Sequence, residues 1–486
     1  MVERRFPTKT RRRFLKTGAV ATAVAIAGCG ADDEGDNESP DTPDDTETET
    51  EQPADDSDDE IGEETVREWS DEYITQYIDR EFDPLADAFS QQFETEYRET
   101  VPSVIQLFSP FDNTHDAIAR QRNALEGQYG IVEAVSDIDI DQQAGVWAAQ
   151  ATLQLETADQ QIILELTDDA NITGFALPNE YSPPAYADES QFEEHSLEFD
   201  HDGVTYPGVL TTPADATNPP CVVLLPGGFG DDENATFGPH QPYRDLAWGL
   251  ATEGIASFRY SREEFMQTTP FPEVRMDNWI VEPGIRALET VAEDAQIDAD
   301  GLFALGFATE GTFVPRVANQ FGGIAGSVLV DVLAEASPEH YFSRREITIE
   351  QPFLTDDEED YIETVLAEFD DAQDRELGAD DNILNIMNGA MWNELEEYDM
   401  AETVRTGETP VFVSQPSYDL SEWNEQKHAK WLDVLEEADG TAELYPAVNT
   451  WLQEAHGPPV PEMVLFHDNV ANVLIEDISE WVHAHS

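Results

Sequence analysis

Two glycine-rich turns, each after an apolar run, are the places in this 486-residue chain where residue type and spacing could support chemistry. The first is Gly227-Gly228-Phe229-Gly230, after Cys221–Leu225, and the second spans Gly306–Gly311, after Leu302–Leu305. A glycine-rich turn after a strand can cradle phosphate, but the first turn lacks the Gly-Lys-Ser/Thr ending of a phosphate-binding loop. We therefore do not expect a nucleotide there.

Other reactive side chains carry weaker signals. His483 and His485 near the C-terminus could flank a metal only with distant ligands, so a solvated tail is the simpler interpretation. Cys221 opens an apolar run, which predicts a buried core cysteine rather than a nucleophile. The sequence predicts no metal site and no cofactor.

Apolar strands alternate with helices from about residue 190 to the end of the chain, which predicts a mostly parallel sheet covered on both faces. Residues 335–400 interrupt this alternation with acidic helices and loops, in the place of a cap. The expected strands are Val204–Leu210, Cys221–Leu225, Ile255–Tyr260, Leu302–Leu305, Ile324–Val332, Pro410–Ser414 and Ala442–Tyr445. The expected helices are Asp245–Thr252, Ile280–Glu293, one from Gly311, one around Trp423–Leu435, and Val473–Val482.

This order of elements over 190–486 resembles the α/β-hydrolase superfamily, in particular its dienelactone hydrolases and esterases. The segments that carry the resemblance are Leu224–Gly230, Asp245–Ala256 and Leu305–Gly311. The resemblance implies that Gly228 and Thr309 occupy the positions that supply oxyanion-hole amides.

The nucleophile elbow of that superfamily has the pattern Gly-x-Ser-x-Gly, and this chain departs from it. Gly306 matches the first glycine, but Ala308 stands at the nucleophile position and Glu310 at the second glycine. Alanine has no nucleophilic atom for a base to activate. We also expect the carboxylate of Glu310 to oppose the stabilisation of an oxyanion.

The remaining triad positions follow in the order acid, then histidine. The resemblance places the acid at Asp419, after Val413–Tyr418, and the base at Thr450, so the acid is kept and the base is lost. The residues that could replace the catalytic serine or histidine are more simply explained by structural positions. His456 lies in an exposed loop, the Thr309 side chain points away in these folds, and surface loops are expected at two serines, Ser261 and Ser414.

Two functions are therefore predicted. The first is a non-catalytic protein that uses the hydrolase cleft to bind a small acyl or peptide-like ligand or a protein partner. The alternative is an active carboxylic ester or lactone hydrolase with a non-standard nucleophile. A purely structural role as a spacer is a third interpretation.

A smaller unit is predicted before the hydrolase-like one. Residues 65–180 are helical first and extended afterwards, with neighbouring antiparallel strands at Val146–Leu155 and Gln161–Leu166. This pattern indicates a small α+β domain, and it resembles a domain of unknown function that precedes hydrolase domains in exported proteins. Residues 180–189 resemble a linker.

The N-terminus resembles an export signal. Thr10–Lys16 matches the twin-arginine pattern, Ala19–Ala27 is a short apolar stretch, and Ile26-Ala27-Gly28-Cys29 resembles a lipoprotein cleavage site. We expect residues 1–29 to form this signal and lipid on Cys29 to hold the protein on the outer face of the cytoplasmic membrane. Residues 30–64 are acidic, contain no Lys or Arg, and predict a disordered tether.

The charge excludes one class of partner. The chain has 104 acidic against 24 basic side chains, a net charge of −80, and its only lysines are Lys9, Lys16, Lys427 and Lys430. Nucleic-acid binding is excluded because a protein with this net negative charge repels the phosphate backbone instead of attracting it. An acidic, lysine-poor surface resembles that of proteins from extreme halophiles, where multimolar salt screens the self-repulsion.

Overall fold

A computed structural model describes residues 61–100, 113–143, 145–227, 230–335, 356–383, 387–418, 421–457 and 465–486. The expected export signal, Cys29 and residues 30–60 of the expected tether lie outside the described residues. The tether was expected to run to residue 64, but helix α2 (Glu63–Ile78) already begins at Glu63, so its last two residues belong to the folded region. Within the described part of the chain, no helix has the length and apolar character needed to cross a membrane.

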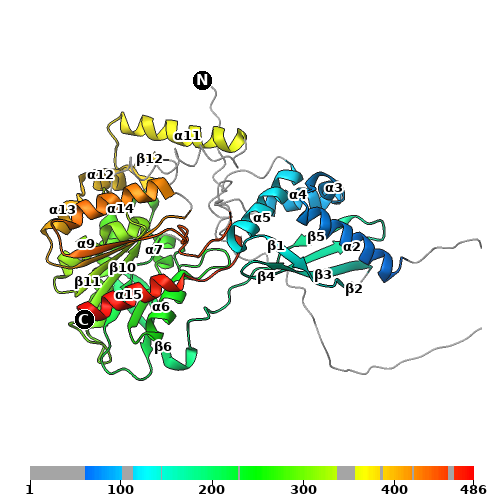
Figure 1. Ribbon diagram of the computed structural model, residues 1–486. Coiled ribbons are helices and arrows are strands. Elements are labelled where there is room, and N and C mark those ends of the chain that lie inside the picture. Colours follow the sequence, from blue (N-terminus) through cyan, green and yellow to red (C-terminus); the bar gives the residue numbers. More distant parts are fainter. Residues whose placement is uncertain are drawn as a thin grey trace, which may run out of the picture.

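An eight-stranded sheet forms the centre of the C-terminal region (Figure 1). Its strands run in the order β15-β14-β11-β10-β8-β9-β7-β6. Five neighbouring pairs, from β15 across to β9, are parallel, whereas β7 pairs antiparallel with both β9 and β6. The strands are β6 (Phe192–His201), β7 (Val204–Pro213), β8 (Cys221–Leu224), β9 (Ala256–Tyr260), β10 (Leu302–Phe307), β11 (Gly326–Val330), β14 (Val411–Pro416) and β15 (Gly440–Tyr445).

The strand order confirms the predicted α/β-hydrolase fold, and every strand expected from Val204 onward is present. The central strands form because β8, β10 and β11 are apolar enough to be buried on both faces. Edge strand β6 was not predicted from the sequence. It alternates exposed charged residues with apolar ones, and its main partner is the next strand of the same hairpin.

Helices cover both faces of this sheet. On one face, α6 and α15 pack with the sheet into one apolar cluster, whereas α8, α9 and α14 contribute to the cluster on the other face. Cys221 is fully buried, as predicted. The covering helices are α6 (Pro242–Thr252), α8 (Glu282–Ala292), α9 (Ala308–Phe321), α14 (Ser421–Leu435) and α15 (Asn472–His485).

Shorter elements complete this region. A π-helical turn, η3 (Asp277–Val281), leads directly into α8. Within 335–400, Phe369 and Trp392 pack ring against ring and join two of the helices. The remaining elements are η1 (Glu189–Gln191), α7 (Glu263–Thr268), η2 (Phe271–Glu273), α11 (Asp356–Gln373), β12 (Asn382–Ile383), β13 (Met387–Asn388), α12 (Gly389–Glu397) and α13 (Met400–Thr406). The prediction that residues 335–400 form a cap over the cleft remains a prediction.

Helices and a second, antiparallel sheet form the N-terminal region. Strand β3 pairs with β1, β2 and β4, and β4 pairs with β5. The elements are α2 (Glu63–Ile78), α3 (Phe82–Asp87), α4 (Gln91–Thr100), α5 (Thr114–Tyr129), β1 (Val132–Val135), β2 (Asp139–Gln143), β3 (Val146–Leu155), β4 (Asp159–Leu166) and β5 (Ile172–Ala176).

The segment expected to act as a linker is bound to the large region. The hydroxyl of Tyr181 donates to Asp245 at 2.8 Å, and that of Tyr186 donates to the carbonyl of Val470 at 2.8 Å. These contacts tie residues 180–189 to α6 and to the loop before α15.

Candidate functional site

The turn from β10 to α9 has the geometry of a strand–elbow–helix. Ala308 is the first residue of α9 and has φ +48°, in the left-handed region that non-glycine residues rarely adopt. A Cβ added to Gly306 would lie 2.7 Å from the Cα of Gly311, and one added to Gly311 would lie 2.3 Å from a methyl of Val332. Strand and helix therefore approach so closely that both glycines are required.

This geometry corrects one boundary and refines the elbow pattern. The helix begins at Ala308, not at Gly311, because the chain turns within a single strained residue. The close packing on β10 is made by Gly311, one residue after Glu310, so the expected second glycine has moved by one position. The side chain at the turn is a methyl group, which has no electron pair for acyl transfer.

Glu310, whose expected effect on an oxyanion stays a prediction, forms an ion pair with an arginine. It is buried, and its Oε1 accepts a hydrogen bond of 2.9 Å from Nη1 of Arg262. Burial raises the pKa of the Glu310 carboxyl, and the Arg262 guanidinium opposes that rise. The charge expected to oppose an oxyanion is therefore paired with an arginine.

The same arginine holds the first glycine-rich turn. Arg262 also donates to the carbonyl of Pro226 at 2.9 Å and to Asp231 at 2.7 Å, and it stacks on Trp279. A Cβ added to Gly227 would lie 1.8 Å from Cδ of Glu310, so glycine is required where this side chain passes under the turn. Arg262 and Glu310 thus join the two turns.

The residues predicted to supply oxyanion-hole amides are only partly described. Thr309 lies in the first turn of α9 and is half-buried. Gly228 lies outside the described residues, as does Asp419, the predicted acid. Their roles stay predictions.

Thr450, the position predicted for the base, lies in a buried polar cluster. Its hydroxyl donates to Oδ2 of Asp331 at 2.7 Å. Oδ1 of the same carboxylate accepts from Nζ of Lys427 at 2.5 Å and from Nε2 of Gln415 at 2.9 Å. Asp331 follows β11, and Gln415 lies near the end of β14. The cluster therefore lies at the carboxyl edge of the sheet, where ligands bind in open α/β folds.

Sequence reasoning missed Asp331 and Lys427. Both are 5% exposed, and they are separated by 96 residues in the chain. Two signals were present. Asp331 directly follows the buried strand β11, and Lys427 is one of only two lysines outside the predicted export signal.

The structure also describes three residues that were considered from the sequence as substitutes for triad members: Ser261, Ser414 and His456. Ser261 and Ser414 are not surface serines, since they are 4% and 0% exposed. The hydroxyl of Ser261 donates to the carbonyl of Asp231 at 3.1 Å. His456 is exposed, as predicted, and its backbone N–H donates to the carbonyl of Gly127 near the end of α5.

The loop between β15 and α15 also contacts the N-terminal region. Gln128 of α5 donates to Asp468 at 2.9 Å, and the hydroxyl of Tyr129 donates to the carbonyl of His467. Burial raises the pKa of Asp468 to about 6. Burial also raises the pKa of Asp245, in α6, to about 7. The loop that carries Thr450 is thus held between the two regions.

Comparison with known proteins gives one relative with a curated description. The chain is 23% identical over 202 residues to the esterase EstD of Thermotoga maritima, covering 41% of this chain and 48% of the relative. The chain thus spans about half the length of that relative. No protein-family model matches the chain.

Solved esterases resemble the C-terminal region at low identity. One of two Rhizomucor miehei esterases has 16% identity and a TM-score of 0.40, covering 60% of this chain and 84% of the other. The Pyrobaculum calidifontis esterase has 12% identity and a TM-score of 0.39, covering 60% and 87%. These TM-scores are below 0.5, and the fold assignment rests on the strand order. The C-terminal region has an α/β-hydrolase fold.

Proposed function

We propose that the C-terminal region binds a small acyl or ester ligand at the carboxyl edge of its sheet without hydrolysing it through a serine triad. The observation that carries this proposal is Ala308, which occupies a strained elbow with a side chain that cannot attack a carbonyl. The buried pairs Arg262–Glu310 and Lys427–Asp331 support it, because they fix the two turns and the base position without a histidine.

An active carboxylic ester hydrolase is the second candidate. The similarity to the esterase of Thermotoga maritima favours it more directly than it favours a non-catalytic protein. Such an enzyme needs a hydroxyl close to a base. Two described hydroxyls meet this requirement: that of Thr450, which is hydrogen-bonded to the Asp331 carboxylate, and that of Ser182, which lies 3.1 Å from Nε2 of His467.

Binding and turnover can be separated with one probe, p-nitrophenyl butyrate, in multimolar KCl. Saturation-transfer NMR measures binding, and nitrophenolate release measures hydrolysis. Thr309→Phe, at the elbow, is expected to weaken binding at least tenfold. Thr290→Phe makes the same change at another half-buried threonine, in α8, and should leave binding unchanged. Equal binding by both variants would contradict a ligand site at the elbow, whereas release of nitrophenolate by the wild type would favour the second candidate.

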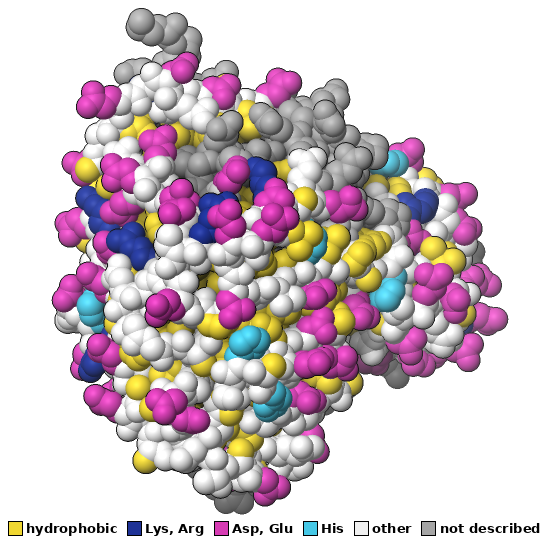
Figure 2. All heavy atoms as spheres, turned by 60° about the vertical axis from the view of Figure 1, so that its left-hand side comes forward, with side chains coloured by type: hydrophobic (Ala, Val, Ile, Leu, Met, Phe, Trp, Pro, Cys, Tyr) yellow, Lys and Arg dark blue, Asp and Glu magenta, His cyan; other side chains and the backbone are white. Residues whose placement is uncertain are grey.

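We also propose that the protein is exported, anchored through lipid on Cys29 and adapted to high salt. The sequence motifs at Thr10–Lys16 and Ile26–Cys29 support the first two statements. For the third, Figure 2 shows carboxylates spread over one face of the molecule, with far fewer basic side chains among them. Metabolic labelling with a radioactive lipid precursor, lost in Cys29→Ala, tests the anchor.

A further inference from the structure

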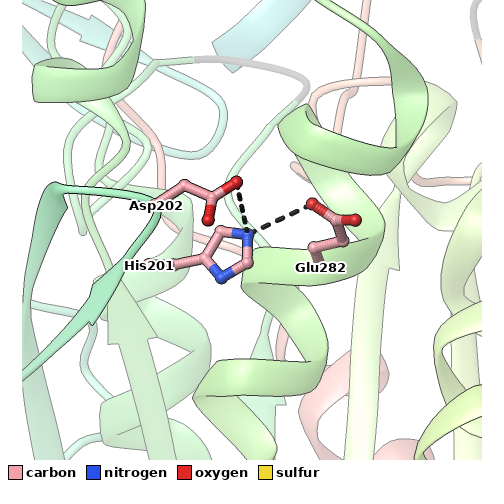
Figure 3. Close-up of side chains that lie close together, drawn as sticks. All are labelled: His201, Asp202 and Glu282. Carbon is pink, nitrogen blue, oxygen red and sulfur yellow. Dashed lines mark hydrogen bonds and ion pairs between the residues drawn. The ribbon is translucent and has the colours of Figure 1, made fainter.

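Three side chains with metal-binding atoms meet at the tip of the β6–β7 hairpin (Figure 3). His201 ends β6, Asp202 lies in the hairpin turn, and Glu282 is the first residue of α8. Nε2 of His201 lies 3.2 Å from Oε2 of Glu282 and 4.0 Å from Oδ2 of Asp202. One ligand atom from each residue lies within 4.8 Å of the other two.

These separations suit ligands of a single ion. Zinc binds imidazole nitrogen and carboxylate oxygen at about 2.0–2.2 Å, so two ligands of a tetrahedral site are about 3.4 Å apart. The distances from Nε2 of His201 to the carboxylate oxygens of Glu282 and Asp202, 3.2 and 4.0 Å, lie on either side of that value. Both carboxylates approach the same ring nitrogen, as Figure 3 shows.

The backbone presents the donors from fixed positions. His201 pairs with Val204 in the hairpin, so Asp202 and Gly203 form a two-residue turn. Their φ values are +49° and +82°, as a tight type I′ turn requires. Glu282 begins α8 directly after the π-helical turn η3. The three metal-ligating side chains are therefore held by a hairpin and a helix rather than by a long loop.

We propose that His201, Asp202 and Glu282 bind a divalent transition-metal ion of the zinc class, with water completing the coordination. An imidazole in the set favours such an ion over calcium or magnesium, whose sites are built from oxygen. The side chains of Asp202 and Glu282 are 84% and 47% exposed, so an ion has access from solvent. The bound ion would fasten the edge hairpin of the sheet to α8.

The test uses the untagged, chelator-treated full chain in multimolar KCl, which screens diffuse binding to surface carboxylates. Titration with Zn²⁺ by calorimetry and with Co²⁺ by absorption is expected to show one bound ion. His201→Ala should lower the affinity at least tenfold, and Glu282→Gln should also lower it. His195→Ala is the matched control. His195 lies on the same strand with its Nε2 3.7 Å from Oε2 of Glu193, and among the described residues it has no third ligand group.

A second measurement separates lost binding from lost folding. Saturating Zn²⁺ should raise the melting temperature of the wild type and of His195→Ala, and not that of His201→Ala. Absence of a stoichiometric site in the wild type would overturn the proposal. Equal affinity of His201→Ala and the wild type would also overturn it and leave the cluster as ion pairs between a histidine and carboxylates.

Discussion

The hydroxyl of Thr450 donates a hydrogen bond of 2.7 Å to the carboxylate of Asp331. The threonine at the position predicted for a catalytic base is therefore not an isolated side chain. It belongs to a buried cluster in which Lys427 supplies the positive charge that neutralises Asp331. The cluster links strand β11, helix α14 and the loop after β15, and it keeps the base position ordered without an imidazole.

Removal of the buried Lys427 side chain should lower the free energy of unfolding. Lys427→Met leaves Asp331 charged and buried, and breaking such a pair costs about 3–5 kcal/mol. Lys430→Met is the matched control on the same helix. Lys430 pairs with Glu335 at 2.6 Å, but both side chains are about half exposed, so the expected loss is about 0–1 kcal/mol. Urea unfolding at fixed KCl measures both, and equal losses would contradict the assignment of a buried pair.

The strained elbow predicts an unusual response to glycine. The left-handed conformation costs an alanine about 1–2 kcal/mol, and Ala308→Gly releases this strain. Glycine itself costs about 0.5–1 kcal/mol in conformational entropy, so the two effects offset each other. The unfolding free energy should therefore stay equal or rise. Ala304→Gly, in the buried middle of β10, has no strain to release and should lose about 1 kcal/mol or more. Equal losses at both positions would mean that Ala308 is unstrained.

Much of the fold could be predicted from local sequence. Strands such as β8 and β10 are continuous apolar runs, and the turn at Gly306–Gly311 follows the second run directly. The edge strand β6 was missed because half of its surface faces solvent and its residues are charged.

The site could be predicted only in part, for a related reason. The sequence singled out Ala308 and Thr450 through a resemblance to a family pattern, and their equivalence to triad positions stays a prediction. The pairings Arg262–Glu310 and Lys427–Asp331 join residues 48 and 96 positions apart, and no local pattern specifies which charges meet. Only the packing of the sheet brings these charges together.

The buried carboxyl of Asp245 predicts a dependence of stability on pH. Its pKa is raised to about 7, so between about pH 4 and 7 the folded chain keeps a proton that the unfolded chain has lost. The contribution of Asp245 to the unfolding free energy therefore falls as pH rises through this window, by at most about 1.4 kcal/mol per unit. Asp245→Asn should flatten the profile at fixed KCl, and Asp433→Asn, an exposed control, should leave it unchanged. Parallel profiles for the wild type and Asp245→Asn would contradict this.

The net charge of −80 predicts a dependence on salt. Self-repulsion among carboxylates should unfold the protein below about 1 M KCl, where the Debye length grows past roughly 3 Å. Circular dichroism during dialysis from multimolar KCl checks this, with sucrose as a control that raises osmolality without screening charge. A melting curve that is the same in dilute buffer and in multimolar KCl would argue against adaptation to high salt.

An elbow without a nucleophile should not hydrolyse p-nitrophenyl butyrate, and an assay in multimolar KCl measures this directly. We expect the wild type to release nitrophenolate at the rate of the buffer alone. Ala308→Ser/Thr450→His, measured beside it, should gain turnover if both positions are the triad equivalents. Wild-type turnover that survives repurification would contradict the proposal that the protein does not hydrolyse esters. It would mean that another side chain attacks the ester.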